Sequence, residues 1–281
     1  MSLNAVLSNA LSGLAVAQNA LSVTSHNVAN ANTDGYSRQL PQQEAQLVAG
    51  RGAGARSLAT TRAVDELLTE RVREQQGRVG RSAALEEVHA EVQDRVFGAP
   101  GDADGGIANR ISALAKAAET LAAGPDQPAL AAQLVGAAAD FARELASAGA
   151  EVQGLRRSLD QGVAGIIAEV NGELADLDQL NRVFGRGEAG PDLEDQRDRI
   201  LAGLAEKLDI SITRGDDGKI AVYARGGQPL LDGSLRQLVY RPAAEVGSGT
   251  VFGSIGIYRA ADLDAVDTSA SMVSPDSGQA R

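Results

Sequence analysis

The chain has 281 residues, and with 26 Lys plus Arg against 37 Asp plus Glu its formal net charge is −11. An acidic chain without a concentrated basic segment argues against nucleic acid and anionic membranes as partners. The sequence contains no cysteine, which excludes disulfides and thiolate metal sites, and only 3% of its residues are aromatic. The core must therefore be built mainly from Ala, Leu, Val and Ile.

The first 30 residues carry the heptad pattern of a coiled-coil helix. Leu7 starts a series that recurs every seven positions, and a second such series begins at Leu3 and includes Ala17. Together the two series alternate in steps of four and three, which is the a/d spacing of a coiled coil. We predict a helix whose subunit-packing seam consists of Leu3, Leu7, Leu11, Leu14, Leu21 and Val28.

The heptads alone leave the partner of this helix open. An isolated helix of this length is marginal in water because nucleation is costly, so either the chain's own core or a neighbouring protein must fill the seam. A signal peptide is disfavoured, since the segment lacks a basic start and a continuous apolar core. A transmembrane span is disfavoured because polar residues such as Asn9, Gln18 and Asn19 interrupt the apolar ones.

A cluster of turn-forming residues follows the helix, between positions 25 and 39. Asn, Thr, Asp and Gly concentrate here, which predicts that the helix ends and the chain changes direction. The helix and this cluster together resemble the N-terminal signature of the axial proteins of the bacterial flagellum, which are the rod, hook and hook-associated proteins. The resemblance is carried by Asn27, Asn30, Thr33, Gly35, Tyr36 and Arg38.

Residues 37–60 are rich in Gly and Ala and contain few periodic apolar residues, so we expect a partly extended connector. Gly50, Gly52 and Gly54 suggest a nucleotide-binding loop, but no strong strand precedes them and the phosphate-loop signature is incomplete. A flexible joint explains these glycines better.

Helical periodicity dominates the middle of the chain. We predict a long helix over 61–97, loosened at Gly77 and Gly80, a shorter one over 107–123 and a very long one over 128–184. At 1.5 Å per residue the last helix spans about 80 Å. We expect this helix to pack against the helix over 61–97, which gives an elongated bundle of antiparallel helices.

Asp102 and Asp104, between the first two of these helices, suggest calcium ligands. The segment departs from the EF-hand pattern, because glycine comes too early and Ala113 stands where the bidentate glutamate is needed. A capped turn is the better interpretation.

A charged helix is predicted over residues 192–208, with Asp192 as its N-cap. Its carboxylates suggest a metal site or an acid–base pair. Arg197 and Arg199 lie among them, and carboxylates are favourable near a helix N-terminus, so we interpret them as solvated charges.

Beyond this helix the apolar period changes from helical to two. Ile210 and Ile212, then Ile220 and Val222, flank an acidic turn that ends in Gly218 and predict a β-hairpin. Two further strands are expected over 235–240 and 251–258.

These elements predict a mainly α protein with a smaller β part, of the α+β class. It consists of an N-terminal coiled-coil-type helix, an elongated bundle of long antiparallel helices and a small antiparallel sheet. We expect four divisions of the chain. Residues 1–36 form the heptad helix with its Asn-rich turn, and residues 37–60 form the connector. Residues 61–258 form the helical-bundle domain with its hairpin elements, and residues 259–281 form a linker or the start of a truncated outer domain.

Two later segments narrow the resemblance. LEDQRDRILAGLAEKLDISI and GGQPLLDGSLRQL resemble the corresponding run of the flagellar hook-associated protein 1 family, whose body also begins with long helices. The resemblance covers about residues 1–240. In that family the N-terminal helix pairs with a C-terminal heptad helix in the inner tube of the flagellum. Because this sequence contains no such second helix, we expect an N-terminal fragment that lacks the outer domain and the closing helix.

The resemblance implies assembly rather than chemistry. It implies a structural role at the hook–filament junction, a ring of identical subunits, and contacts with the hook protein and the adjoining hook-associated protein. It also implies an export chaperone for the missing C-terminal part, and an extracellular position in the flagellum reached through the flagellar secretion channel without a cleaved signal peptide. No cofactor, nucleic acid or membrane is expected.

Two other classes of function remain as alternatives. One is another axial protein of the rod or hook, and the other is a secreted coiled-coil adhesin, for which Arg214-Gly215-Asp216 spells a cell-adhesion tripeptide. An enzyme is disfavoured, because His26 and His89 lie in separate helical segments without a nucleophile or a metal cluster. We therefore expect no catalytic, cofactor-binding or metal-binding residues.

Overall fold

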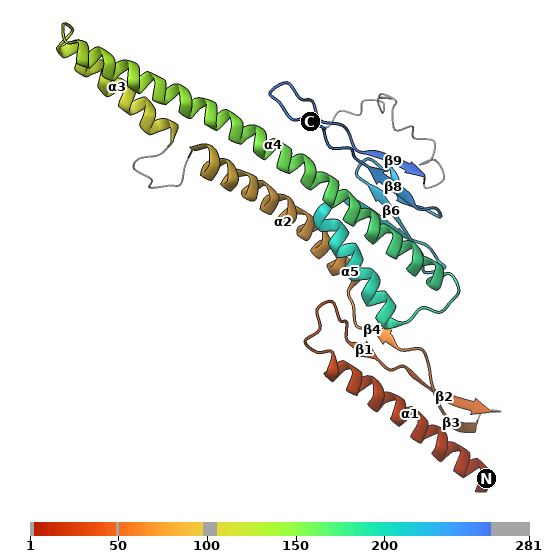
Figure 1. Cartoon of the computed structure of the whole chain (residues 1–281). Coiled ribbons are helices and arrows are strands. Elements are labelled where there is room, and N and C mark those ends of the chain that lie inside the picture. The colour runs from red at the N-terminus through yellow and green to blue at the C-terminus, as the bar shows by residue number, and fades with distance from the viewer. Residues whose placement is uncertain (1–2, 49–50, 98–105, 260–281) are drawn as a thin grey trace. The chain divides into compact units, whose positions relative to one another are not determined.

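The structure, a computed structural model, describes residues 3–48, 51–97 and 106–259 (Figure 1). Within these ranges the protein is α+β, with long helices and small antiparallel sheets. It divides into two compact units, Met1–Arg78 with Gly172–Arg236, and Val79–Asn171 with Gln237–Arg281. Two helices of the expected 61–258 domain contribute residues to both units, and the expected division of the chain into four parts stays a prediction.

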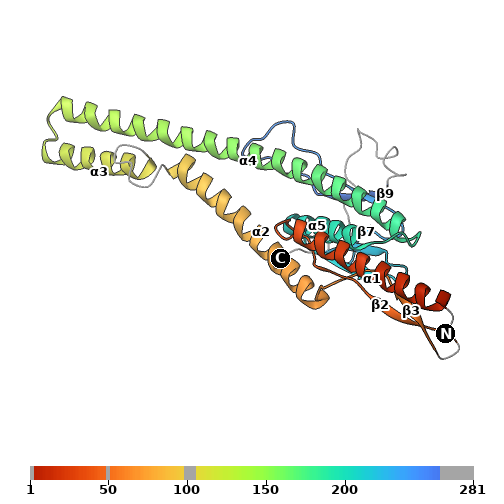
Figure 2. The same ribbon diagram turned by 90° about the horizontal axis from the view of Figure 1, so that it is seen from below.

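The N-terminal part consists of one helix and four short strands. The predicted heptad helix is α1, and its bounds and those of the strands are α1 Leu3–Ala29, β1 Gln39–Leu40, β2 Gln43–Val48, β3 Arg51–Ser57 and β4 Thr61–Arg62. β1 pairs with β4, and β2 pairs with β3, both antiparallel. β3 packs along α1, as Figures 1 and 2 show.

The segment expected to be a flexible connector therefore forms the β2–β3 hairpin. Its glycines serve close packing rather than looseness. Gly54 has a φ of 107°, and a Cβ at this position would collide with the hydroxyl of Ser12 on α1. That hydroxyl accepts a hydrogen bond from the N–H of Ala55 at 3.2 Å. The hairpin is therefore ordered by the helix beside it, which the sequence pattern of the connector did not reveal.

The helix expected over 61–97 is shorter at its start. Thr61 and Arg62 pair with β1, so α2 spans Glu66–Val92 and is followed by a π-helical turn, Gln93–Phe97. The Asp65 carboxylate accepts a hydrogen bond from the N–H of Leu68 at 3.1 Å, as a helix N-cap does. The helix is not broken at its glycines.

Gly77 instead marks a close approach of two helices in the first unit. A Cβ at Gly77 would lie 2.8 Å from the carbonyl oxygen of Ala205. Ala205 belongs to α5, which spans Pro191–Lys207. The glycine thus lets α2 and α5 pack with little space between their backbones.

In the second unit, α3 and α4 form a helical hairpin. α3 spans Ile107–Ala123, which confirms the prediction, and α4 begins at Pro128 and ends at Phe184. With 57 residues, α4 is about 85 Å long. Arg110 of α3 lies 3.7 Å from a carboxylate oxygen of Glu144 of α4, and the two helices run side by side in both views (Figures 1 and 2).

The core of the first unit lies between the end of α4, α5 and a three-stranded sheet. The predicted β-hairpin is confirmed as β5 and β6, and a third strand extends it in the order β5-β6-β7. The strands are β5 Ile210–Arg214, β6 Ile220–Ala224 and β7 Pro229–Leu231. Side chains that are at most 1% exposed come from α4, α5, β6 and β7: Leu174, Leu177, Leu201, Leu204, Val222, Leu230 and Leu231.

Two asparagines of α4 bind strand backbones with their side chains. Asn181 accepts a hydrogen bond from the N–H of Ile220 at 3.0 Å and donates one to its carbonyl at 2.8 Å. Asn171 binds both backbone groups of Leu238 in the same way, each at 2.8 Å. Leu238 lies in β8, Arg236–Val239, which pairs with β9, Gly256–Arg259.

The last expected strand, 251–258, is thus replaced by a shorter one. The preceding loop is bound by α4, since Arg156 donates hydrogen bonds to the carbonyls of Gly247 and Thr250 at 2.7 and 2.8 Å. The proposed calcium ligands Asp102 and Asp104, and residues 260–281, lie outside the described residues.

Candidate functional site: an exposed helix seam and a polar joint

The seam of α1 is exposed to solvent. Its six residues are between 55% and 84% exposed: Leu3, Leu7, Leu11, Leu14, Leu21 and Val28. Apolar side chains gathered on one face of a helix normally pack against another element. The described part of the chain supplies no such element, so no described core residue fills the seam.

The opposite face of α1 packs within the chain. Val16 and Val23 are the buried residues of this helix, and Ser12 binds β3. At 3.6 residues per turn, each residue advances by about 100°, and the centres of the two faces then lie about 165° apart. The β2–β3 hairpin therefore supports α1 from behind and leaves the seam facing away from it.

By length and composition, α1 is the one helix of the described residues that could cross a membrane. A spanning helix exposes apolar surface on all sides, whereas the face of α1 opposite the seam carries Asn9, Ser12 and Asn19. Because β3 covers that face, only the seam offers a continuous apolar surface.

Asn27 organises the turn that follows α1. Its side-chain oxygen accepts hydrogen bonds from the N–H of Gln39 at 2.8 Å and from the hydroxyl of Tyr36 at 2.7 Å. Its amide donates to the carbonyl of Gln39 at 2.9 Å. The asparagine side chain thus acts as a strand partner for β1 and fixes where α1 lies relative to that strand.

Other residues of the turn motif close the end of the helix. The Asn30 amide donates to the carbonyl of His26 at 3.0 Å, and the Thr33 hydroxyl lies 3.4 Å from the side-chain oxygen of Asn30. Gly35 has a φ of 72°, and a Cβ there would collide with the side chain of Arg199 on α5. The structure therefore brings these motif residues together as a turn.

Two motif residues differ in their surroundings. Burial of the Tyr36 phenol, followed by the charges of Asp192 and Asp195, raises its pKa above the ordinary value. The phenol therefore stays neutral and keeps its hydrogen bond to Asn27. The side chain of Arg38 is exposed, and only its carbonyl takes part in the turn, accepting from the N–H of Ala63 at 2.8 Å.

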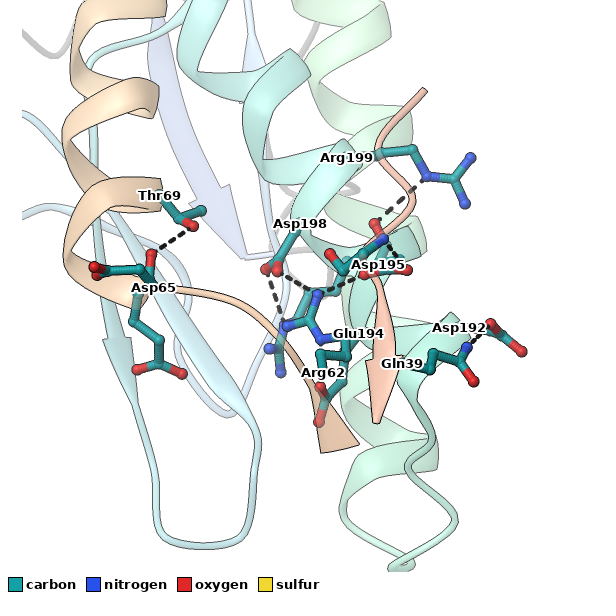
Figure 3. Close-up of polar contacts among 12 residues, drawn as sticks. Gln39, Arg62, Asp65, Thr69, Asp192, Glu194, Asp195, Asp198 and Arg199 are labelled. Carbon is teal, nitrogen blue, oxygen red and sulfur yellow. Dashed lines mark hydrogen bonds and ion pairs between the residues drawn. The ribbon is translucent and has the colours of Figure 1, made fainter. Parts of the chain in front are cut away.

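A polar joint connects the N-terminal part to α5. Arg62 of β4 lies among three carboxylates of the first turns of α5 (Figure 3). Its Nε is 2.6 Å from Glu194, and its Nη1 is 2.7 Å from Asp195 and 2.8 Å from Asp198. The side chains of Arg62 and Asp195 are only 7% and 4% exposed, so this is a buried ion-pair cluster.

Three further contacts belong to the same joint. The N–H of Ser37 donates to Asp195 at 2.9 Å, and the amide of Gln39 donates to Asp192 at 2.7 Å. His26 lies 3.3 Å from the same Asp192 oxygen. Asp192 was expected to cap α5, but this was wrong: Gly190 is the N-cap and the first position is proline, which frees Asp192 to bind the turn.

Asp198 is shared by several cations. Arg62 binds one carboxylate oxygen of Asp198. The other oxygen lies 3.7 Å from Nε of Arg197 and 4.0 Å from Nη2 of Arg214. Burial lowers the pKa of Arg197, and this effect exceeds the attraction of Asp198. For Arg62, burial also lowers the pKa, but the hydrogen bonds with Asp195 and Asp198 outweigh it and the pKa is raised.

The interpretation of these carboxylates as solvated charges was therefore wrong for the inner ones. Asp195 and Arg197 are each 3% exposed, and Arg197 stacks on the ring of Phe184 with its guanidinium carbon 4.8 Å from the ring centre. Arg62 pairs with the inner carboxylates of Asp195 and Asp198. Among the described residues no group of three or more His, Asp and Glu side chains is arranged to hold a metal ion.

Sequence reasoning missed Arg62. It lies 133 positions from Asp195, and a lone arginine within a two-residue strand gives no periodic signal. The sequence of α5 did contain a signal. Four carboxylates lie within the seven positions Asp192–Asp198, which is more negative charge than the helix N-terminus and the arginines of α5 neutralise.

Known proteins resemble this chain over most of its length. Residues 94–255 match the family described as "Flagellar hook-associated protein FlgK helical domain", and residues 7–36 match "Flagella basal body rod protein". The chain is 26% identical to flagellar hook-associated protein 1 of Salmonella typhimurium and 25% identical to that of Escherichia coli K12, over 254 residues in each case.

These alignments cover 86% of this chain, which spans only 45% and 46% of the two relatives. Among solved structures, the flagellar hook junction protein FlgK from Burkholderia pseudomallei matches with a TM-score of 0.53 and 21% identity. That match covers 66% of this chain and 35% of the other. At this identity the likeness concerns the fold alone.

Proposed function

Since the chain belongs to the flagellar hook-associated protein FlgK family, whose helical domain its residues 94–255 match, we propose that it is a structural component of the bacterial flagellum that joins hook to filament. The observation that carries the proposal is the seam of α1, an uncharged apolar surface that faces away from the rest of its own segment. A surface of this kind is expected to be buried between neighbouring subunits.

Helix packing between subunits supplies the mechanism. Burying one Leu or Val side chain contributes about 1.5 to 3 kcal/mol, so the six seam residues together can offset the cost of ordering the helix and its neighbours. The subunits form a ring of identical copies, next to the hook protein on one side and the adjoining hook-associated protein on the other. No chemistry is required for this role.

The same proposal covers export and location. The protein is exported through the flagellar secretion channel without a cleaved signal peptide and resides in the extracellular flagellum. An export chaperone binds the C-terminal part of the full-length protein. The absence of charge between Met1 and Thr33 suits a segment that is buried in the assembled structure rather than in solvent.

The alternatives are less well supported. A rod or hook protein is supported by the match at residues 7–36 alone, whereas the longer match supports the hook-associated protein. An adhesin that uses Arg214-Gly215-Asp216 requires a free arginine, but Arg214 forms an ion pair with Glu66. We therefore retain the junction protein as the proposed function.

The test compares Leu14→Asp with the matched control Ala15→Asp in the bacterium from which the chain derives. Both positions are exposed in the free chain, and Ala15 points away from the seam by about 105°. We expect Leu14→Asp to abolish incorporation at the hook–filament junction, with normal helicity of the purified protein, and Ala15→Asp to incorporate. Normal incorporation of Leu14→Asp, or loss of its helicity, would contradict the proposal.

A further inference from the structure

We infer that Arg62 is the positioning residue of the seam, because its ion pairs with α5 hold the N-terminal segment, residues 3–48 and 51–62, in one direction against the body of the first unit. The body is here the end of α4 from Gly172, α5 and the strands β5 to β7. The inference rests on the proposed function, since the direction of the seam matters only when neighbouring subunits must meet it.

The N-terminal segment is attached to the body by polar contacts. In the described part of the chain, no apolar side chain between Val23 and Ala117 is buried, although Gln39 is. The buried apolar residues of the body lie in α4, α5 and the strands instead. No shared apolar core crosses the joint, so hydrogen bonds and ion pairs must fix the direction of the segment.

Among these contacts, Arg62 binds the most partners. Its planar guanidinium reaches three carboxylates at once, which a single ammonium group cannot do. If Arg62 is lost, Asp195 remains buried without a cation, which is strongly unfavourable. The segment relieves this cost by moving away and letting water reach the carboxylate.

The body does not depend on this contact. Leu201 and Leu204 of α5 are at most 1% exposed in the apolar core, and Lys207 pairs with Glu173 of α4 at 2.7 Å. Loss of Arg62 is therefore expected to release the segment while α5 remains in place.

A short series of contacts connects Arg62 to the seam. Arg62 is the strand partner of Gln39 in the β1–β4 pair. Gln39 is bound through both backbone groups by the side chain of Asn27, which lies in the last turns of α1. Arg62 of β4, bound to α5, thus determines the direction of α1 through Gln39 and Asn27.

The test measures a distance between spin labels on the segment and on the body. The full chain contains no cysteine, so Ser22→Cys on α1 and Gln179→Cys on α4 label it at two exposed positions. We expect a narrow distance distribution for this labelled chain, and loss of the narrow peak for Arg62→Met. Arg62→Lys should keep part of the peak. The control Arg56→Met removes an exposed pair with Glu44 and should leave the peak intact.

Three results would overturn the inference. The first is a narrow peak in Arg62→Met, the second a broad distribution in the labelled chain itself, and the third a loss of helicity of the body in Arg62→Met. Asp195→Asn provides a second variant, which should broaden the distribution without removing a cation. Leu14→Asp should keep the narrow peak, so a failure of the proposed function in the incorporation test leaves this measurement unaffected.

Discussion

The seam and the joint reverse the usual distribution of residue types. The seam is apolar and more than half exposed, whereas the centre of the joint, Arg62 with Asp195, is charged and almost wholly buried. The joint is tolerable in the interior because its charges find partners within the chain. The seam finds none in the described residues. The comparison shows which surface is complete in one subunit and which requires a neighbour.

The two regions should therefore respond oppositely to mutation. Changes in the joint should alter the free chain, because its partners are present there. Changes in the seam should alter assembly and leave the free chain almost unchanged. The following predictions run from the largest expected effect on the free chain to the smallest.

The largest effect is expected for Arg62→Met. Breaking a buried ion pair by removing one partner costs about 3–5 kcal/mol. Hydrogen exchange should show it at the N–H of Ser37, which donates to Asp195 and should lose protection in the variant. Arg56→Met is the control, since its exposed pair contributes about 1 kcal/mol at most. Equal protection of Ser37 in both variants would contradict a joint held by Arg62.

A smaller effect is expected for Asn27→Ala. The change leaves both backbone groups of Gln39 without their side-chain partner, and an unsatisfied buried group costs about 1–3 kcal/mol. Chemical denaturation monitored at Tyr36 should show the loss. Asn32→Ala, at an exposed position of the same turn, should match the parent chain. A loss of stability as large for Asn32→Ala would show that the turn composition, not the bond to β1, matters.

An alkaline effect is expected in the second unit. The hydrogen bond from Tyr240 to Asp160 raises the pKa of this phenol above its ordinary value. A raised pKa in the folded state means that the contribution is complete below pH 10 or so and is lost as the pH rises through the folded pKa. Thermal unfolding against pH should show this alkaline loss, and the loss should be smaller in Tyr240→Phe, where only the other phenols with a raised pKa, Tyr36 and Tyr223, still contribute. An identical profile for both proteins would contradict the assignment.

The smallest effect on the free chain is expected for Leu14→Asp. Substitutions at exposed positions usually change the free energy of unfolding by no more than about 0.5 kcal/mol. The melting temperature of the purified variant should therefore match that of Ala15→Asp. A marked destabilisation would mean that the seam is already packed in the free chain, against the exposure found here.

The sequence predicted the elements in which apolar residues recur at a regular spacing. The apolar spacing of α3 and the alternation around Gly218 determined one helix and one hairpin almost to the residue. Both signals are local, since the spacing of the apolar residues within each element indicates its type without reference to distant parts of the chain. The heptads of α1 likewise identified the surface that remains exposed.

The joint did not follow from the sequence, because its contacts are long-range and polar. Arg62 and Asp195 are far apart in the chain, and a single sequence does not indicate which cation pairs with which carboxylate. The N-cap of α5 was misassigned for a related reason. Asp192 has the right residue type, but the N-cap is Gly190, two positions earlier, and the Asp192 carboxylate binds Gln39 instead.

The central claim is that the seam is open in the free subunit and closed in the assembled one. Ala17→Cys tests it directly, because Ala17 is exposed on the seam side of α1 and the parent chain has no cysteine. The rate of thiol alkylation is measured on the free protein and on isolated flagella, with Gln179→Cys as the reference for reagent access. We predict rapid alkylation of free Ala17→Cys and strong protection after assembly. Equal rates in the two states, or protection already in the free chain, would contradict the account.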